Sequence, residues 1–358
     1  MKEFDAKLPV HRDIQTQNDY IPDDIPSDLF VKAPLDQKKS EEISTPSMSF
    51  WQEAFQRLTK NKGAMISLVL LLLLIVMALI GPSMNEFTYR EQNLAHSNMP
   101  PKVAGLEWMG FDGIDANGVN QYAERDVATN YWFGTDEFGR DLWTRVWKGT
   151  QISLFIALVA AALDLVIGVI YGGISSFYGG RVDNVMQRII EVLMGIPNLI
   201  VIILFILVLE PGIRSIILAM IITGWVGMAR VVRGQILQLK GQEFVLASRT
   251  LGASNGRLIW KHLMPNVMGP VIVTVMFTIP TAIFFEAFLS FIGLGLQAPL
   301  ASLGVLIEDG YKSMRYFPYK LIYPALVISI IMICFNLLAD GLRDALDPKM
   351  KKIGEGPP

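Results

Sequence analysis

The apolar residues of this chain gather into six long runs that polar stretches separate. A helix that crosses the hydrocarbon core of a bilayer needs roughly 20 consecutive apolar residues. By that measure the pattern predicts an all-α integral membrane protein with six transmembrane helices. The predicted spans cover about residues 63–82, 150–174, 188–210, 213–233, 267–295 and 321–340.

The N-terminal part of the chain precedes the first span and has two different patterns. Residues 1–47 are polar and interrupted by prolines, without an apolar period, which predicts a disordered tail. Residues 48–62 place Phe50, Trp51, Phe55 and Leu58 at helical spacing, with basic residues between and after them. This pattern predicts an amphipathic helix on the membrane surface.

Positive charge beside the spans predicts their orientation, because Lys and Arg concentrate in short cytoplasmic loops. Both termini are then cytoplasmic, with a tail at residues 341–358 and a cytoplasmic loop at 234–266. Residues 83–149 form an external insert and residues 296–320 a second external loop. The basic residues that support this assignment are Arg57, Lys60, Lys62, Arg181, Arg188, Arg233, Lys240, Arg249, Arg257, Lys261, Lys349, Lys351 and Lys352.

Composition agrees with a membrane protein and excludes several function classes. Of the 358 residues 52% are hydrophobic and 18% charged, and the net charge of −2 gives no footprint for nucleic acid. One cysteine, Cys334, and three scattered histidines predict neither a disulfide framework nor a metal centre. The chain contains no Gly-x4-Gly-Lys-Ser/Thr motif, so it is not expected to hold ATP or to be an enzyme.

The loop between the fourth and fifth spans carries the strongest functional pattern. Phe244, Ala247 or Ser248, and Leu251 share one helical face, and Gly252 is placed to end that helix. A second short helix is expected from Ser254 or Asn255 until Pro265 stops it, and the residues on its apolar side are Leu258, Ile259 and Leu263. An apolar patch on such a hairpin fits a groove in a partner. Periodicity alone leaves open that both helices pack on the chain's own spans.

This loop resembles the EAA loop of bacterial ABC importer permeases, the segment that docks into the ATPase subunit. The family's Glu-Ala-Ala-x3-Gly pattern falls on Leu246, Ala247, Ser248 and Gly252, with leucine in place of the glutamate. The resemblance implies that this loop couples the permease to the ATPase. The candidate coupling residues are Glu243, Ala247, Ser248, Arg249, Leu251, Gly252, Ala253, Ser254, Met264 and Pro265.

A second stretch, GTDEFGRD at residues 134–141, is similar to a signature of dipeptide, oligopeptide and nickel permeases. The matching residues are Gly134, Thr135, Asp136, Gly139, Arg140 and Asp141. The glycines permit tight turns, and the charged residues can cross-link the turn through hydrogen bonds. The segment would then form a rigid plug over the mouth of the pathway, or it would contact substrate directly. The stretch EAFLSFIGLG at residues 286–295 resembles another segment of the same subfamily, and the likeness covers roughly residues 50–350.

Together these resemblances imply the C-type permease of a bacterial peptide importer with the type I ABC importer fold. Its partners would be a second permease, two ATPase subunits that carry ATP and Mg, and an extracellular substrate-binding lipoprotein. This chain would bind no cofactor and would lie in the bacterial cell membrane, moving peptide by alternating access.

Three acids within predicted spans need partners or water, because an ionised acid in lipid is costly. Glu286 is a candidate for the pathway wall or a gate, or for packing against the partner permease. Glu191 precedes a predicted helix break at Gly195 and Pro197, and is a second pathway or gate candidate. For Asp164 a structural pairing is favoured.

Two other functions stay open at this stage. An ion-coupled secondary transporter could use Glu286 and Glu191 as proton sites, but it leaves the helix–glycine–helix loop unexplained. A nickel permease of the same architecture is less favoured than a peptide permease, because no Met/His cluster occurs at an external position.

Overall fold

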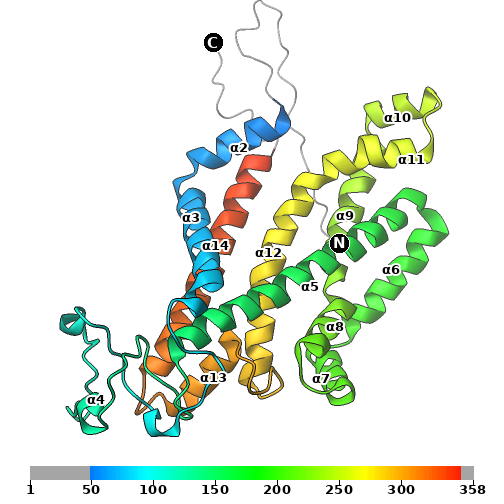
Figure 1. The fold of residues 1–358 in the computed structure, drawn as a ribbon. Helices are drawn as coiled ribbons and strands as arrows, with labels where there is room; N and C mark the ends of the chain where they lie inside the picture. The colour runs from blue at the N-terminus through cyan, green and yellow to red at the C-terminus, as the bar shows by residue number, and fades with distance from the viewer. Residues whose placement is uncertain (1–48, 348–358) are drawn as a thin grey trace, which may run out of the picture. The chain divides into compact units, whose positions relative to one another are not determined.

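The computed structural model describes residues 49–347, and within that range the chain forms helices, turns and isolated β-bridges. The predicted tail at residues 1–47 and residues 348–358 at the other end lie outside it, with Lys349, Lys351 and Lys352. Figure 1 shows the helices. In order they are α2 (Phe50–Lys60), α3 (Lys62–Ile80), η2 (Gly81–Ser83), η3 (Leu94–His96), η4 (Glu107–Met109), α4 (Gln121–Glu124), α5 (Leu142–Tyr178), α6 (Gly180–Gly195), α7 (Asn198–Leu209), α8 (Ile213–Thr223), α9 (Trp225–Lys240), α10 (Glu243–Thr250), α11 (Asn255–Arg257), the π-helix η5 (Leu258–Leu263), α12 (Met264–Phe291), α13 (Leu303–Ser313) and α14 (Tyr319–Leu346).

The membrane spans agree with the predicted fold class. Among the described residues, 5 helical segments are long and apolar enough to cross a membrane: Lys62–Ser83, Leu142–Tyr178, Ile213–Lys240, Asn255–Phe291 and Tyr319–Leu346. The count reaches 6 only if α6 and α7, which bend by 79° at their junction, form one broken span. The bend lies at the predicted break, where Pro197 has no N–H to continue the helix.

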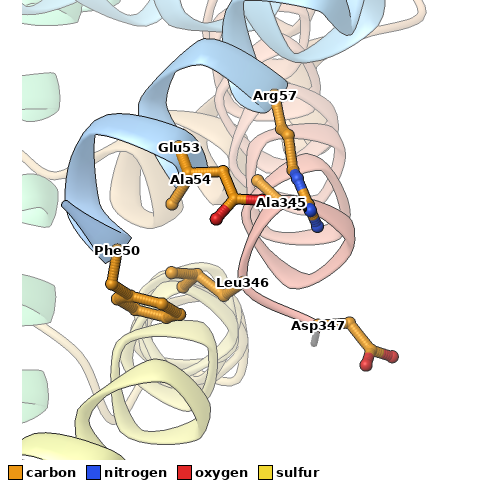
Figure 2. Close-up of a pocket in the computed structure, with 7 residues that line it drawn as sticks. All are labelled: Phe50, Glu53, Ala54, Arg57, Ala345, Leu346 and Asp347. Carbon is orange, nitrogen blue, oxygen red and sulfur yellow. Dashed lines mark hydrogen bonds and ion pairs between the residues drawn. The ribbon is translucent and has the colours of Figure 1, made fainter. Parts of the chain in front are cut away.

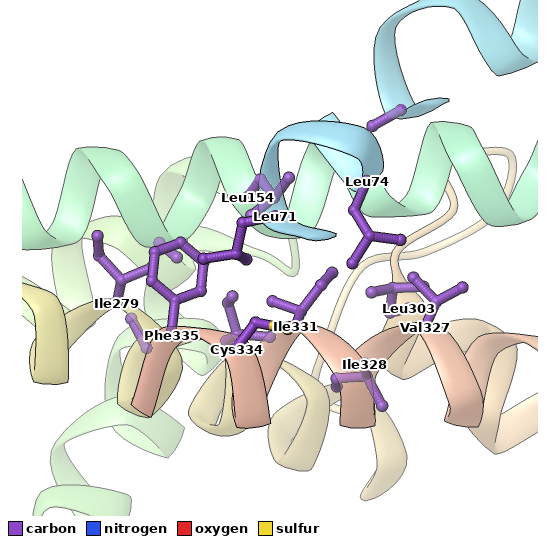
Figure 3. Close-up of a cluster of buried hydrophobic side chains, with 14 of the residues drawn as sticks. Leu71, Leu74, Leu154, Ile279, Leu303, Val327, Ile328, Ile331, Cys334 and Phe335 are labelled. Atoms are coloured by element: carbon purple, nitrogen blue, oxygen red, sulfur yellow. The ribbon is translucent and has the colours of Figure 1, made fainter. Parts of the chain in front are cut away.

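The main core joins α3, α5, α12 and α14 (Figure 3). The leucines of α3 face two different environments. Leu71 and Leu74 are buried against the other helices, whereas Leu72 and Leu73 are exposed. A helix that is apolar on all sides faces either core or lipid. The exposed leucines of α3 therefore fit a lipid-facing surface.

Glycines set the close approach of α5 and α9. A Cβ on Gly168 would lie 2.5 Å from the Cβ of Met228, and one on Gly172 would lie 2.3 Å from the carbonyl oxygen of Ala229. Paired small residues four apart allow helix backbones to touch in membranes. The same spacing on α5 fixes α9 beside it, and α9 leads directly into the α10–α11 loop.

Several boundaries differ from the prediction. Helix α5 begins at Leu142 rather than near residue 150, because the Asp141 side chain caps it there. Its first turns contain charged residues beside aromatic ones, so a search for a continuous apolar run misses them. Helix α14 continues past residue 340 to Leu346. The second predicted external loop contains α13, which Ser302 caps through its side chain.

The two functional segments lie at opposite ends of the long helices (Figure 1). Helices α10 and α11 lie at the same end as α2, whereas α4 and α13 lie at the other end. A small pocket separates α2 from the last turn of α14, and Figure 2 shows Phe50 and Leu346 on its two sides. The predicted amphipathic helix thus packs beside the end of the last span.

Candidate functional site

The hairpin, defined here as residues 241–263, turns at Gly252. This glycine has a φ of +82°, a left-handed conformation that favours glycine. The Gly252 N–H donates to the Arg249 carbonyl at 3.0 Å, and the Ala253 N–H donates to the Ser248 carbonyl at 3.1 Å. These are the two bonds of a Schellman motif, which satisfies the last carbonyls of a helix. The corner of the hairpin therefore has a defined geometry.

The inner face of the hairpin packs on the chain's own helices. Val245, Leu258 and Leu263 are buried in one cluster with Phe177 of α5 and Val267 of α12. The cluster also includes residues of α9. A displacement of the hairpin would therefore be passed to three long helices through a packed contact.

The exposed side of the hairpin, called its outer face here, carries large apolar side chains among polar ones. Leu251 is 88% exposed and Trp260 is 75% exposed, and Phe244 and Leu246 are also exposed. Large apolar side chains grouped on a protruding surface mark an interaction site. The packing on the chain's own helices is confirmed for the inner face, and docking of the exposed side chains into a partner stays a prediction. The polar candidates Glu243 and Arg249 are exposed as well.

The smaller candidate residues shape the hairpin. Ser248 donates its hydroxyl to the Phe244 carbonyl at 2.8 Å, and Ser254 caps the second helix by accepting the Arg257 N–H at 3.4 Å. Ala247 is exposed and Ala253 is half-buried beside the inner cluster. These hydrogen bonds stabilise each short helix locally.

The expectation that Pro265 stops the second helix is wrong. The chain passes from the π-helix η5 into α12, with Met264 first and Pro265 in its first turn. Proline is tolerated at this position because the N–H groups in the first turn of an α-helix have no partner within that helix. The fifth span is therefore continuous with the hairpin.

The GTDEFGRD motif forms a tight turn against residues 93–99 of the insert. Gly134 and Gly139 have φ values of +78° and +70°. A Cβ on Gly139 would lie 1.8 Å from the Asn93 carbonyl oxygen, and one on Gly134 would lie 2.4 Å from the Met99 carbonyl oxygen. Thr135 accepts the Met99 N–H at 2.8 Å. Only glycine fits the two close approaches.

Asp136 and Arg140 of the motif are buried and paired. Asp136 accepts hydrogen bonds from the Arg140 Nε at 2.6 Å and the Arg140 N–H at 3.0 Å. Asp136 also lies 3.5 Å from Arg145, whose other Nη nitrogen lies 3.7 Å from Asp309 of α13. Asp136, Arg140 and Arg145 are all at most 4% exposed. This arrangement matches the rigid-plug interpretation rather than direct contact with substrate.

Asp141 anchors the start of α5. Its Oδ2 accepts the Thr144 N–H at 2.8 Å, the Thr144 hydroxyl at 2.7 Å and the Asn85 side-chain amide at 2.8 Å. Burial raises the pKa of the Asp141 carboxyl above its ordinary value, against the opposing effect of these hydrogen bonds. The hydrogen bonds fix the position of the carboxyl, while burial makes its ionised form less stable than in water.

Glu286 is fully buried within the chain. Its two oxygens accept hydrogen bonds from the hydroxyls of Ser153 on α5 and Ser290 on α12, each at 2.9 Å. Ser153 in turn accepts the N–H of Leu303, the first residue of α13, at 3.2 Å. Glu286 thus joins three helices through hydroxyl groups, and this conformation does not present it on an open surface.

The other intramembrane acids differ from one another. Glu191 is half exposed on α6 and pairs with Arg188 at 2.6 Å. Asp164 of α5 is 6% exposed, and its Oδ1 has no hydrogen-bond partner among the described residues. Residues 49–347 thus supply no hydrogen-bond partner for Oδ1, and a structural role for Asp164 at a contact with another subunit stays a prediction.

Several charged contacts could not be predicted from sequence. Asp183 of α6 accepts two hydrogen bonds from Arg233 of α9, and Arg145 pairs with both Asp136 and Asp309. The sequence does show that these charged residues lie inside or beside apolar runs, which indicates that they need partners. The pairing itself needs the three-dimensional arrangement of α5, α6, α9 and α13.

Membrane-spanning helices, 5 or up to 6 among the described residues, define a multi-pass membrane protein. Residues 136–352 match the family described as binding-protein-dependent transport system inner membrane component. Residues 49–101 match the family described as N-terminal TM domain of oligopeptide transport permease C. The chain belongs to the binding-protein-dependent transport system inner membrane component family.

Similar proteins span nearly the same length. The chain is 46% identical to the oligopeptide transport system permease protein OppC of Bacillus subtilis (strain 168), covering 92% of this chain and 99% of that protein. It is 45% identical to the dipeptide transport system permease protein DppC of the same organism, covering 96% and 99%. A solved structure titled as inward facing conformations of the MetNI methionine ABC transporter matches with a TM-score of 0.47 and 19% identity, covering 57% of this chain and 96% of that chain.

Proposed function

We propose that this chain is the C-type permease subunit of an ABC importer that takes up oligopeptides or dipeptides. Relatives named as oligopeptide and dipeptide permeases match it over nearly its whole length. The match to an oligopeptide permease C domain at residues 49–101 supports the C-type assignment. A second permease would complete the pathway through the membrane.

The exposed outer face of the hairpin is the observation that carries the coupling part of this proposal. Leu251 lies beside the corner that Gly252 fixes and Trp260 lies on the π-helix η5, and residues 49–347 leave both exposed. An apolar face of this kind fits a groove on a separate ATPase subunit, which would hold ATP and Mg. The hairpin end is then cytoplasmic, as are both termini, and the insert is external.

Coupling follows from how the hairpin is packed. Its inner residues Val245, Leu258 and Leu263 are buried among residues of α5, α9 and α12. When ATP closes the ATPase subunits, their grooves would move the hairpin and rotate these helices. The contact does so only if it is stronger in one ATPase state than in the other. A substrate-binding lipoprotein would deliver peptide to the insert end.

The GTDEFGRD motif, with Asp136, Arg140 and Asp141 buried, has a structural role in this mechanism. It ties the insert to α5 through Asp141 and, through Arg145, approaches α13. A rigid cap at the external end would keep the mouth of the pathway in shape while the opposite end moves. Glu286 would hold α5, α12 and α13 together below that cap.

The test is uptake of a radiolabelled tripeptide by vesicles that contain the assembled complex, together with co-purification of the ATPase subunits. Leu251→Asp and Trp260→Asp each place a charge on the outer face and are expected to lower both readouts at least tenfold. Leu94→Asp is the matched control, since Leu94 is 70% exposed in the insert at the other end. Unchanged co-purification in both hairpin variants would contradict the docking.

The same vesicles separate the proposal from an ion-coupled transporter. Uptake is expected to require ATP and all partner subunits, and to stop when the ATPases are omitted. Uptake by this chain alone, driven by a proton gradient, would instead support the alternative in which Glu286 and Glu191 serve as proton sites.

A further inference from the structure

Helix α6 carries exposed charges in a segment that is apolar overall. Helices α6 and α7 are together long and apolar enough to cross a membrane as one broken span. Arg188 lies eight residues after the start of α6, about 12 Å along the helix axis. Its side chain is 82% exposed and that of Glu191 is 51% exposed. An exposed charge inside a span is costly against lipid, so these two residues face water or another protein.

The side chains of α6 divide into three faces. One face packs on the chain itself through the buried residues Asp183 and Ile190. A second face, called the polar face here, is exposed and has the three- and four-residue spacing of one side of a helix: Arg181, Asn184, Arg188 and Glu191. The third face is exposed and apolar: Val182, Val185, Ile189 and Val192. Lipid suits the apolar face but not the polar face.

Helices α6 and α9 pack together and run antiparallel. Asp183 of α6 accepts two hydrogen bonds from Arg233 of α9. Seven residues further along α6, Ile190 belongs to a buried cluster that includes Val226, which lies seven residues before Arg233. Residue numbers therefore rise along α6 while they fall along α9, and both contacts fix the same register.

This register brings a second arginine to the level of Arg188. Arg188 is five residues beyond Asp183, and Arg230 is three residues before Arg233, roughly 8 Å and 5 Å from that ion pair along the two axes. Arg230 is exposed on α9, inside the span Ile213–Lys240. Within residues 49–347 it has no hydrogen bond or ion pair. The exposed charge at this level of the spans is therefore positive overall.

We propose that the polar face of α6 is part of the wall of a water-filled pathway, and that Arg188 binds the carboxylate end of the transported peptide there. The proposal rests on the proposed function, because it takes peptide as the solute and a second permease as the other wall. A guanidinium has five N–H donors, and Glu191 accepts one of them at 2.6 Å. The remaining donors can hold a carboxylate in the bidentate geometry that arginine favours. Arg230 adds positive charge at the same level, which attracts anions over cations.

Glu191 indicates a ligand that comes and goes rather than a permanent partner. A charge inside the membrane needs compensation at all times. Glu191 compensates Arg188 while no peptide is present, whereas a fixed acid of the second permease would make this pair unnecessary. Glu191 also lies four residues before Gly195, where α6 ends and the chain bends by 79° into α7. An acid of the second permease would offer the same carboxylate chemistry, and the experiment below distinguishes it from peptide.

The first measurement compares two neighbouring thiols at one depth of α6. Asn184→Cys lies on the polar face and Val185→Cys on the apolar face, each in a Cys334→Ser background that removes the natural thiol. The assembled complex in lipid nanodiscs is treated with a water-soluble anionic thiosulfonate, and labelling is read from the mass of this chain. Asn184→Cys is expected to react at least tenfold faster than Val185→Cys. Equal rates, or no reaction at Asn184→Cys, would overturn the pathway wall.

The second measurement asks whether Arg188 attracts anions. The anionic reagent is compared with a cationic thiosulfonate of similar size at Asn184→Cys, which lies one turn from Arg188. The ratio of the two rates is expected to fall at least threefold when Arg188→Gln is added, and to be kept by Arg188→Lys, which retains the charge. A ratio that Arg188→Gln leaves unchanged would overturn the role of Arg188.

The third measurement identifies the carboxylate. An excess of trialanine is expected to slow labelling of Asn184→Cys at least fivefold, and trialanine amide, whose C-terminal end is uncharged, to leave it unchanged. Equal protection by both peptides, or by neither, would overturn the peptide carboxylate as the ligand. A charge preference without protection by either peptide would assign Arg188 to an acid of the second permease.

Uptake of trialanine under ATP by complex with the natural sequence, measured in parallel, keeps the two proposals apart. Normal uptake without the labelling pattern above contradicts this inference alone. No uptake together with faster labelling of Asn184→Cys contradicts the proposed function and the peptide ligand, and leaves a water-lined face of α6 for another solute.

Discussion

Arg233 of α9 donates two hydrogen bonds to Asp183 of α6, from Nε to Oδ1 at 2.7 Å and from an Nη nitrogen to Oδ2 at 2.6 Å. Ser175 of α5 donates its hydroxyl to the same carboxylate at 2.5 Å. The pair therefore connects three helices near the end that carries the hairpin. Paired Arg–carboxylate forks of this kind fix geometry as well as charge.

Breaking the Asp183–Arg233 pair one side at a time should destabilise the complex more than breaking both sides. Asp183→Asn and Arg233→Met each leave one charged partner without its counterion, whereas the double variant removes both charges. We expect a coupling free energy of about 1–3 kcal/mol from the double-mutant cycle. The measurement is thermal unfolding of the purified complex. Strictly additive losses would show that the two residues do not interact.

The glycine at position 139 should be irreplaceable, and the reason is a clash rather than backbone conformation alone. Gly139→Ala puts a Cβ 1.8 Å from the Asn93 carbonyl oxygen. Gly118→Ala is the matched control, because Gly118 has a φ of +80° but a Cβ added there would meet no atom within 4 Å. The control should cost about 1–2 kcal/mol of conformational strain.

The yield of folded complex, measured by size-exclusion chromatography after detergent extraction, distinguishes these two glycine variants. Gly139→Ala is expected to reduce the yield severalfold, and Gly118→Ala to leave it close to that of the natural sequence. Equal yields would mean that the insert moves away from Asn93 without loss.

The sequence was sufficient for features that depend on local pattern. The spans follow from the length of the apolar runs, and the hairpin corner follows from Gly252 between two short amphipathic stretches. The break before α7 follows from Pro197. Each of these depends on residues that are close together along the chain.

Other features depend on residues that are distant in the chain. The start of α5 at Leu142 cannot be read from hydropathy, because Asp141, Thr144 and Asn85 stabilise it through hydrogen bonds that such a pattern does not contain. The lack of a partner for Asp164 within residues 49–347 could not be foreseen either, since it depends on which residue of α8–α9 lies opposite. Tertiary contacts decide both cases.

Glu286 provides a prediction that separates hydrogen bonding from charge. Glu286→Gln keeps polar atoms against the hydroxyls of Ser153 and Ser290, which can rotate to donate or accept. We expect this variant to assemble and to import peptide at close to the normal rate. Glu286→Leu removes the acceptor for both buried hydroxyl protons, at about 1–3 kcal/mol each, although Ser153 keeps the bond that it accepts from the Leu303 N–H.

The measurements for Glu286 are thermal unfolding and peptide uptake of the same preparations. The expected order of stability is the natural sequence, then Glu286→Gln close behind it, then Glu286→Leu. If Glu286→Gln were stable but lost uptake, the acid would have a role in transport beyond joining α5, α12 and α13.

Asp141 provides a prediction for pH. Burial raises the pKa of its carboxyl in the folded protein, so the folded state binds a proton more readily than the unfolded state does. Stability therefore falls as pH rises from the ordinary carboxyl value of about 4 through the raised pKa, because stability decreases with pH wherever the folded state binds more protons. Asp141→Asn has no carboxyl to titrate and remains a good helix cap for α5.

The pH effect is measured as the difference in unfolding temperature between Asp141→Asn and the natural sequence at a series of pH values. This difference should move in favour of the variant as pH rises through that window and then become constant, because above the raised pKa the natural side chain carries its full desolvated charge. A difference that instead moved against the variant with rising pH would mean that the hydrogen bonds from Thr144 and Asn85 outweigh burial. The pKa of Asp141 would then lie below its ordinary value in the folded protein.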